Sequence, residues 1–176
     1  MGEAFKKNIL DKVLVGFFSL ILVINSLAMT LMITCAALAR YVFKFNFYGY
    51  DEIVVLIAFW MYFMGAAYGA YNNTHVTADI IDAYFPPGVA RKILTFLRWL
   101  ITSVACGLFV YYGYGYIKFS FMGPLENFMA IPKSMVWRIP LWTSHAAIFF
   151  GLIFMEIYFL RNLVLSADAL FRRREA

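Results

Sequence analysis

Two ionisable side chains inside the last apolar run carry the clearest chemical potential in this sequence. Glu156 lies near the end of that run, and His145 lies nearer its start. A carboxylate in lipid can carry a proton or bind a substrate, but it can also serve structure alone. Glu156 therefore has two readings: a proton or substrate site, or a structural carboxylate that pairs with Arg161 or with a partner chain. The structural reading is favoured, because charge-moving pumps place several such groups near the midplane.

Other arrangements of reactive residues are not indicated by the sequence. The two histidines, His75 and His145, fall on opposite sides of the predicted membrane, so they cannot share a haem, and zinc would lack its remaining ligands. Cys35 and Cys106 lie in apolar runs without a CxxC spacing. No glycine-rich phosphate loop and no catalytic triad pattern is found. We therefore expect neither an enzyme nor a cofactor in this chain.

The composition indicates the elements that must position these residues. The chain has 176 residues, of which 64% are hydrophobic and 14% charged. Soluble domains carry roughly 45–50% apolar and about 25% charged residues, so lipid must cover part of this surface. The net charge of +5 comes from short clusters between apolar runs. That placement is typical of membrane topology and not of nucleic-acid binding.

Four apolar runs predict one all-α membrane domain over residues 1–176, with spans at about 13–39, 53–71, 93–117 and 139–160. The runs are continuous and about twice the length of a barrel strand, which excludes a β-barrel. The first run is too long for the apolar core of a signal peptide, so it is read as a retained helix. Apolar spacing between the second and third spans predicts a short interfacial helix, ended by Pro86-Pro87-Gly88.

The distribution of lysine and arginine predicts the orientation of the helices. The two tails and the connection between the second and third spans hold twice as many of these residues as the other two loops. The positive-inside rule then places both termini in the cytoplasm. Tyrosine, phenylalanine and tryptophan gather near the ends of the spans that face away from the cytoplasm, as expected for an interfacial aromatic belt.

Acidic residues open the second predicted span. Asp51 and Glu52 would complement the positive end of that helix, and Arg40 at the end of the first span could pair with them. The alternative is that these charges dock a soluble partner from outside the membrane. The sequence leaves both readings open.

A run of small residues, Gly65-Ala66-Ala67-Tyr68-Gly69, marks the second predicted span. Small residues four positions apart let two helices approach closely in lipid. The contact is either internal or with another protein. Together with the sparse polar groups, this face indicates a subunit that associates with partners.

The chain carries a set of short motifs in this order: Arg40-Tyr41-Val42-Phe43, Asp51-Glu52, Trp60, Gly65-Ala66-Ala67, His75-Val76 with Asp79, Pro86-Pro87, Arg91-Lys92, Ile131-Pro132 and Ile139-Pro140. Their order and spacing resemble the small membrane subunit, DctQ-like, of the tripartite ATP-independent periplasmic (TRAP) transporters. The resemblance covers about residues 10–162. Tyr48 and Tyr50 stand where the family often has tryptophan, and Asn72 and Asn73 stand where it often has charges. The candidates for family motifs or subunit contacts are Arg40, Tyr41, Phe43, Asp51, Glu52, Trp60, Gly65, Gly69, His75, Asp79, Pro86, Pro140 and Glu156.

The resemblance implies an ion-gradient-driven importer in the bacterial inner membrane. A periplasmic binding protein would deliver an organic acid, such as a sialic acid or a C4-dicarboxylate, to a large membrane subunit that transports it with sodium ions. The small chain would pack against that subunit and help to dock the binding protein. Docking candidates are Arg40, Lys44, Asp51, Glu52, Glu126, Lys133 and Arg138.

Two other functions remain open at this point. The chain could be a self-sufficient, oligomeric carrier or channel that uses Glu156 as its ion site. It could also be a subunit of a membrane oxidoreductase.

Overall fold

The computed structural model describes residues 9–72, 88–122 and 131–171, and these fold as four long helices. They are α1 (Ile9–Tyr41), α2 (Tyr50–Asn72), α4 (Val89–Met122) and α5 (Trp142–Phe171). Each is long and apolar enough to cross a membrane, and no strand occurs in the described ranges beyond an isolated bridge between Lys133 and Pro140. The prediction of an all-α membrane protein with four spans is confirmed. The predicted interfacial helix, with His75, Asp79 and Pro86, lies outside the described residues.

Two of the helices extend well past the predicted spans. Helix α4 has 34 residues and α5 has 30. At 1.5 Å per residue these are about 51 and 45 Å long, more than the ~30 Å hydrocarbon core. Lys118, which lies just past the predicted span 93–117, is therefore part of α4. Pro140 lies just before α5, and its carbonyl accepts a hydrogen bond of 2.7 Å from the Thr143 hydroxyl.

The connection between α1 and α2 is a tight, specific turn. Lys44 has a φ of 55° and Gly49 a φ of 81°, so the chain reverses through two left-handed positions. The amide of Phe45 donates to the Ala39 carbonyl at 3.0 Å, which satisfies one of the last carbonyls of α1. Helix α2 then begins at Tyr50, with Asp51 and Glu52 in its first turn.

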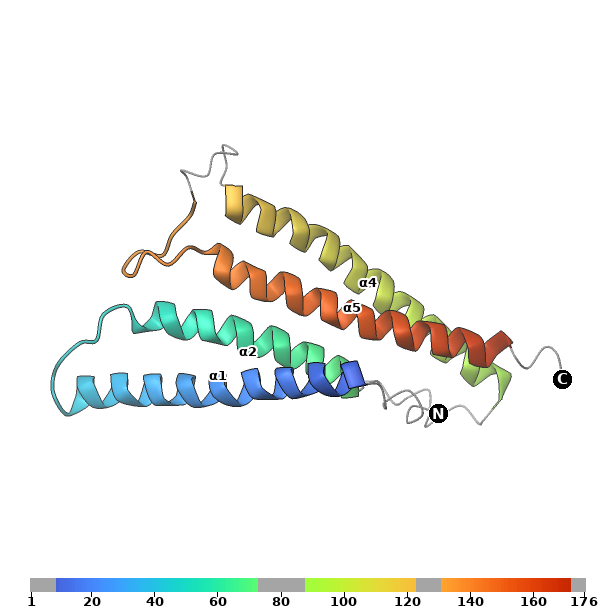
Figure 1. Cartoon of the computed structure of the whole chain (residues 1–176), viewed down its shortest axis with the longest axis horizontal. Coiled ribbons are helices and arrows are strands. Elements are labelled where there is room, and N and C mark those ends of the chain that lie inside the picture. The colour runs from blue at the N-terminus through green and yellow to red at the C-terminus, as the bar shows by residue number, and fades with distance from the viewer. Residues whose placement is uncertain (1–8, 73–87, 123–130, 172–176) are drawn as a thin grey trace.

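The helices pack side by side in the order α1, α2, α5, α4 (Figure 1). Backbones approach one another closely between α1 and α2, between α2 and α5, and between α5 and α4, and in no other pair of the described helices. The result is an open row and not a closed bundle. We call the end with Ile9 and Phe171 the terminal end, and the end with segments 42–49 and 131–141 the loop end.

The buried core lies toward the terminal end, where side chains of α1 reach across to α5. The rings of Phe18 and Phe154 meet edge to face, with centroids 5.1 Å apart. Asp11 and Arg161 form an ion pair of 2.9 Å at the same end. The core cluster consists of Phe18, Met64, Ala67, Ala70, Cys106, Tyr158 and Phe159.

Candidate functional site

Both carboxylate oxygens of Glu52 accept hydrogen bonds, and the donors come from a loop that is distant in the sequence. The Ser134 hydroxyl donates to Oε2 at 2.6 Å. The backbone amides of Val136 and Trp137 donate to Oε1 at 2.8 Å and to Oε2 at 3.0 Å. The first turn of α2 therefore anchors the segment that leads into α5. We call Glu52, Ser134, Val136 and Trp137 the clasp.

The segment that the clasp holds is itself an ordered turn. The amide of Ser134 donates to the Ile139 carbonyl at 2.9 Å, and the Ile139 amide donates back to the Ser134 hydroxyl at 3.0 Å. The indole of Trp137 donates to the Gly49 carbonyl at 3.0 Å. These bonds fix Met135 at the tip, where its side chain is 97% exposed.

Because of the clasp, the charged residues at the loop end do not pair in the way that the sequence suggested. No ion pair joins Arg40 to Asp51 or Glu52 in the described part of the chain, because the oxygens of Glu52 are occupied by residues 134–137. Arg40 and Asp51 instead line one pocket. The docking candidates Lys44, Lys133 and Arg138 are exposed at this end; Glu126 lies outside the described residues.

Glu156 has a different environment from the one the sequence suggested. It lies near the middle of α5, and its Oε1 accepts a hydrogen bond of 2.6 Å from the Ser103 hydroxyl on α4. Its Oε2 is buried without a hydrogen-bond partner. The suggested pairing with Arg161 is wrong, because Arg161 pairs with Asp11. Glu156 therefore makes its contact within this chain, between α4 and α5.

The small-residue face of α2 makes an internal contact. A Cβ atom on Gly65 would lie 3.2 Å from the Leu22 side chain of α1, so Gly65 lets these two helices approach. Ala67 and Ala70 are buried, and Trp60 packs against the core cluster. Tyr41 and Phe43, in contrast, are more than 70% exposed at the loop end.

Sequence reasoning missed the glycine that brings α2 and α5 together. A Cβ atom on Gly151 would lie 2.6 Å from the Cβ of Phe63 and 2.9 Å from its carbonyl oxygen. The signal was available, because Ala147 and Gly151 are small residues four positions apart, and Ala147 is fully buried.

Two polar contacts between α4 and α5 were also missed. Ser120, which is 1% exposed, forms a hydrogen bond with Nδ1 of His145. The ring of Tyr116 lies against the same imidazole, with centroids 4.2 Å apart. His145 falls in the first turn of α5, because the helix begins at Trp142.

The outer helices of the row present broad apolar surfaces. On both α1 and α4, large apolar side chains remain at least half exposed along the length of the helix. They include Phe17, Leu20, Val23, Ile24, Leu27 and Leu31 on α1, and Ile101, Val104, Leu108 and Phe109 on α4. Such surfaces suit lipid or the helices of a membrane partner.

Comparison with known protein families identifies the chain. The family model for the DctQ component of the tripartite ATP-independent periplasmic transporters matches residues 29–169, which include the clasp, Glu156, all of α2 and α4, and most of α5. No curated protein matches the chain. The family is a transporter subunit and not an enzyme. The chain thus belongs to the DctQ family, the small membrane component of TRAP transporters.

Proposed function

We propose that this chain is the small permease subunit of an importer that an ion gradient drives, and that it packs against and stabilises the large transport subunit. A periplasmic binding protein delivers an organic acid to the complex. Sodium ions and the substrate bind in the large subunit, with no cofactor in this chain. The open row of helices is the observation that carries the proposal.

The row supports an associating role for a physical reason. A transport path needs polar groups enclosed by several helices, whereas a row has no interior that all four helices enclose. Its buried acid, Glu156, contacts Ser103 between two neighbouring helices. The exposed apolar faces of α1 and α4 offer area for a second layer of helices.

We propose further that the loop end faces the periplasm and that both termini lie in the cytoplasm of a bacterial cell, with the row in the inner membrane. The bias of lysine and arginine supports this orientation. With Glu52 held in the clasp, and with Arg40 and Asp51 lining one pocket, the docking candidates that remain among the described residues are basic: Lys44, Lys133 and Arg138. They suit an acidic patch on the binding protein.

Reconstitution tests the main proposal. Vesicles that contain this chain together with the large subunit should take up substrate when the binding protein and an ion gradient are supplied. Vesicles with either membrane chain alone should not. Uptake by this chain alone would overturn the proposal in favour of a self-sufficient carrier, and full uptake by the large subunit alone would remove any need for this subunit.

The docking role has a separate test. Replacing Lys133 by Gln should slow capture of the binding protein by about threefold at low ionic strength, because rim charges act mainly on the association rate. The matched control is Lys12→Gln, an exposed lysine at the terminal end. Equal capture rates for both variants and the native complex would contradict docking at the loop end.

A further inference from the structure

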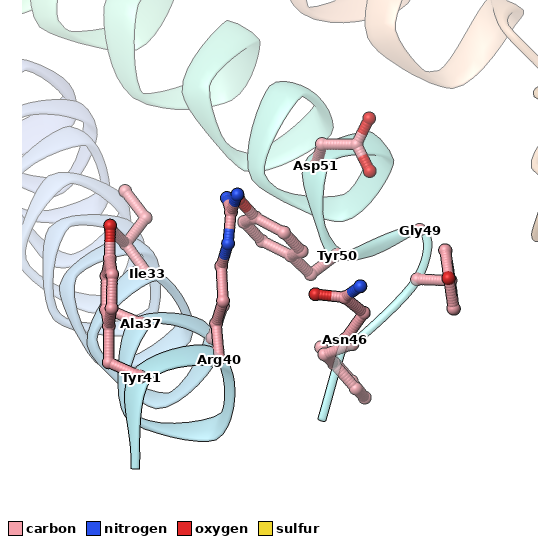
Figure 2. A pocket seen from close by; sticks show the side chains of 11 residues that line it. Ile33, Ala37, Arg40, Tyr41, Asn46, Gly49, Tyr50 and Asp51 are labelled. Carbon is pink, nitrogen blue, oxygen red and sulfur yellow. The ribbon is translucent and has the colours of Figure 1, made fainter. Parts of the chain in front are cut away.

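A pocket of about 360 Å³ opens between the last turns of α1 and the segment that leads into α2. Figure 2 shows Arg40 rising from the end of α1, with Asn46 and Asp51 on the side away from that helix. The lining residues are Ile33, Ala36, Ala37, Arg40, Tyr41, Asn46, Phe47, Tyr48, Gly49, Tyr50 and Asp51.

The lining changes from apolar to charged along the helix axis. Ile33, Ala37 and Arg40 follow one another on one face of α1 (Figure 2), as residues three and four apart do. The apolar members lie within the predicted span, and Arg40 lies just beyond its end. A ligand that fills this pocket therefore needs an apolar part on the membrane side and a polar part at the interface.

The charged members of the pocket are open to a ligand. Arg40 and Asp51 are exposed, and neither makes a hydrogen bond or an ion pair within the residues that the structure describes. The neighbouring acid, Glu52, is held in the clasp and does not neutralise Arg40. The guanidinium matches a phosphate in geometry and charge, while a carboxylate favours a cation that donates hydrogen bonds.

We propose that this pocket binds a phospholipid whose headgroup carries both a phosphate and a primary ammonium, as phosphatidylethanolamine does. Arg40 binds the phosphate, and Asp51 accepts hydrogen bonds from the ammonium. Asn46 supplies a further amide at the headgroup, and an acyl chain lies along Ile33 and Ala37. The site depends on the membrane-spanning fold and not on the transported substrate or the orientation of the chain.

The test uses the delipidated full chain in a non-ionic detergent, with lipid binding followed by native mass spectrometry. Phosphatidylethanolamine, phosphatidylcholine and phosphatidylglycerol with identical acyl chains are compared. Arg40→Gln should weaken binding of all three by about tenfold, because a charge-assisted hydrogen bond is lost. Asp51→Asn should selectively remove the preference for phosphatidylethanolamine, because only that headgroup has ammonium N–H donors.

Lys44→Asn is the matched control, since Lys44 is an exposed cation of the same turn, and asparagine tolerates its left-handed backbone. It should leave binding of all three lipids unchanged. Thermal melting of each variant verifies the fold. The proposal is overturned if Arg40→Gln binds as the native chain does, if the native chain does not prefer phosphatidylethanolamine, or if inorganic phosphate displaces the lipid, which would indicate a plain anion site.

Discussion

Helix α5 is held on its two sides by different physical means. Toward α2, Gly151 removes a side chain so that Phe63 can come into direct contact with the helix. Toward α4, side chains form hydrogen bonds across the contact, from Ser103 to Glu156 and between Ser120 and His145. We call the contact between α2 and α5 the glycine seam, because it depends on the close fit of Gly151 against Phe63. We call the contact between α4 and α5 the polar seam, because hydrogen bonds between side chains cross it.

The difference indicates which seam sets the stability of the row. In membranes, hydrogen bonds between helices contribute about 0.6 kcal/mol on average and at most about 1.7, because the separated helices find other partners. Overpacking a close backbone contact costs about 1–3 kcal/mol and occasionally more. The glycine seam should therefore respond more strongly to substitution than any single polar pair.

Gly151→Leu tests the glycine seam and should have the largest effect. The side chain would meet the Phe63 backbone, which cannot rotate away, so we expect a loss of about 3 kcal/mol or more. Unfolding in a detergent–denaturant titration measures it. Gly16→Leu is the control, because nothing lies within 4 Å of a Cβ atom at Gly16. Similar losses for both variants would break the comparison.

Ser120→Ala tests the polar seam at the hydrogen bond between Ser120 and His145. It leaves Nδ1 of the partly buried His145 without its partner, so we expect a loss of about 1 kcal/mol. The same denaturant titration measures it. A loss equal to that of Gly151→Leu would show that the polar seam, and not the glycine seam, dominates the fold.

Glu156→Gln should change both stability and uptake little. This variant sharpens the comparison, because it distinguishes a structural role of Glu156 from a role in transport. The amide oxygen can still accept the hydrogen bond from Ser103. The NH₂ group replaces Oε2, which has no hydrogen-bond partner, so the substitution breaks no existing hydrogen bond. We expect stability within about 1 kcal/mol and nearly unchanged uptake by the reconstituted complex. Loss of uptake with intact assembly would make Glu156 an ion site.

Glu52→Gln should have the smallest effect on the helices themselves, because the clasp lies outside both seams. Weaker bonds to the amides of Val136 and Trp137 should release the turn locally. Acrylamide should then quench Trp137 more readily in a variant whose other tryptophans are phenylalanine. Asp51→Asn serves as control, and equal quenching in the two variants would argue against the clasp.

The four helices could be predicted because hydropathy and helix length are local properties of the sequence. The order of the helices in the row could not, because it depends on which faces fit together, as at Gly151 and Phe63. The suggested pair of Glu156 with Arg161 failed for a geometric reason. Residues five apart lie about 140° apart around a helix, so Arg161 points elsewhere and meets Asp11.

The clasp was beyond sequence reasoning for a related reason. Asp51 and Glu52 are adjacent and both carry a carboxylate, so their pattern could not tell which one is held internally and which one lines a pocket. The answer depends on the turn at 131–141, whose shape is set by bonds such as that from the Ser134 amide to the Ile139 carbonyl. No periodicity in the sequence encodes such a turn.

The row has a consequence for the way the chain is made. Helices leave the ribosome in order, so α1 and α2 can pair as a hairpin as soon as both are inserted. Helix α4 has no backbone neighbour among the described helices until α5 arrives, since it packs on α5 alone. The insertion of α5 is therefore the decisive last step, because α5 joins α4 to the hairpin of α1 and α2. A chain whose synthesis stops before Trp142 has α4 and the hairpin as two unconnected parts, which membrane proteases can attack.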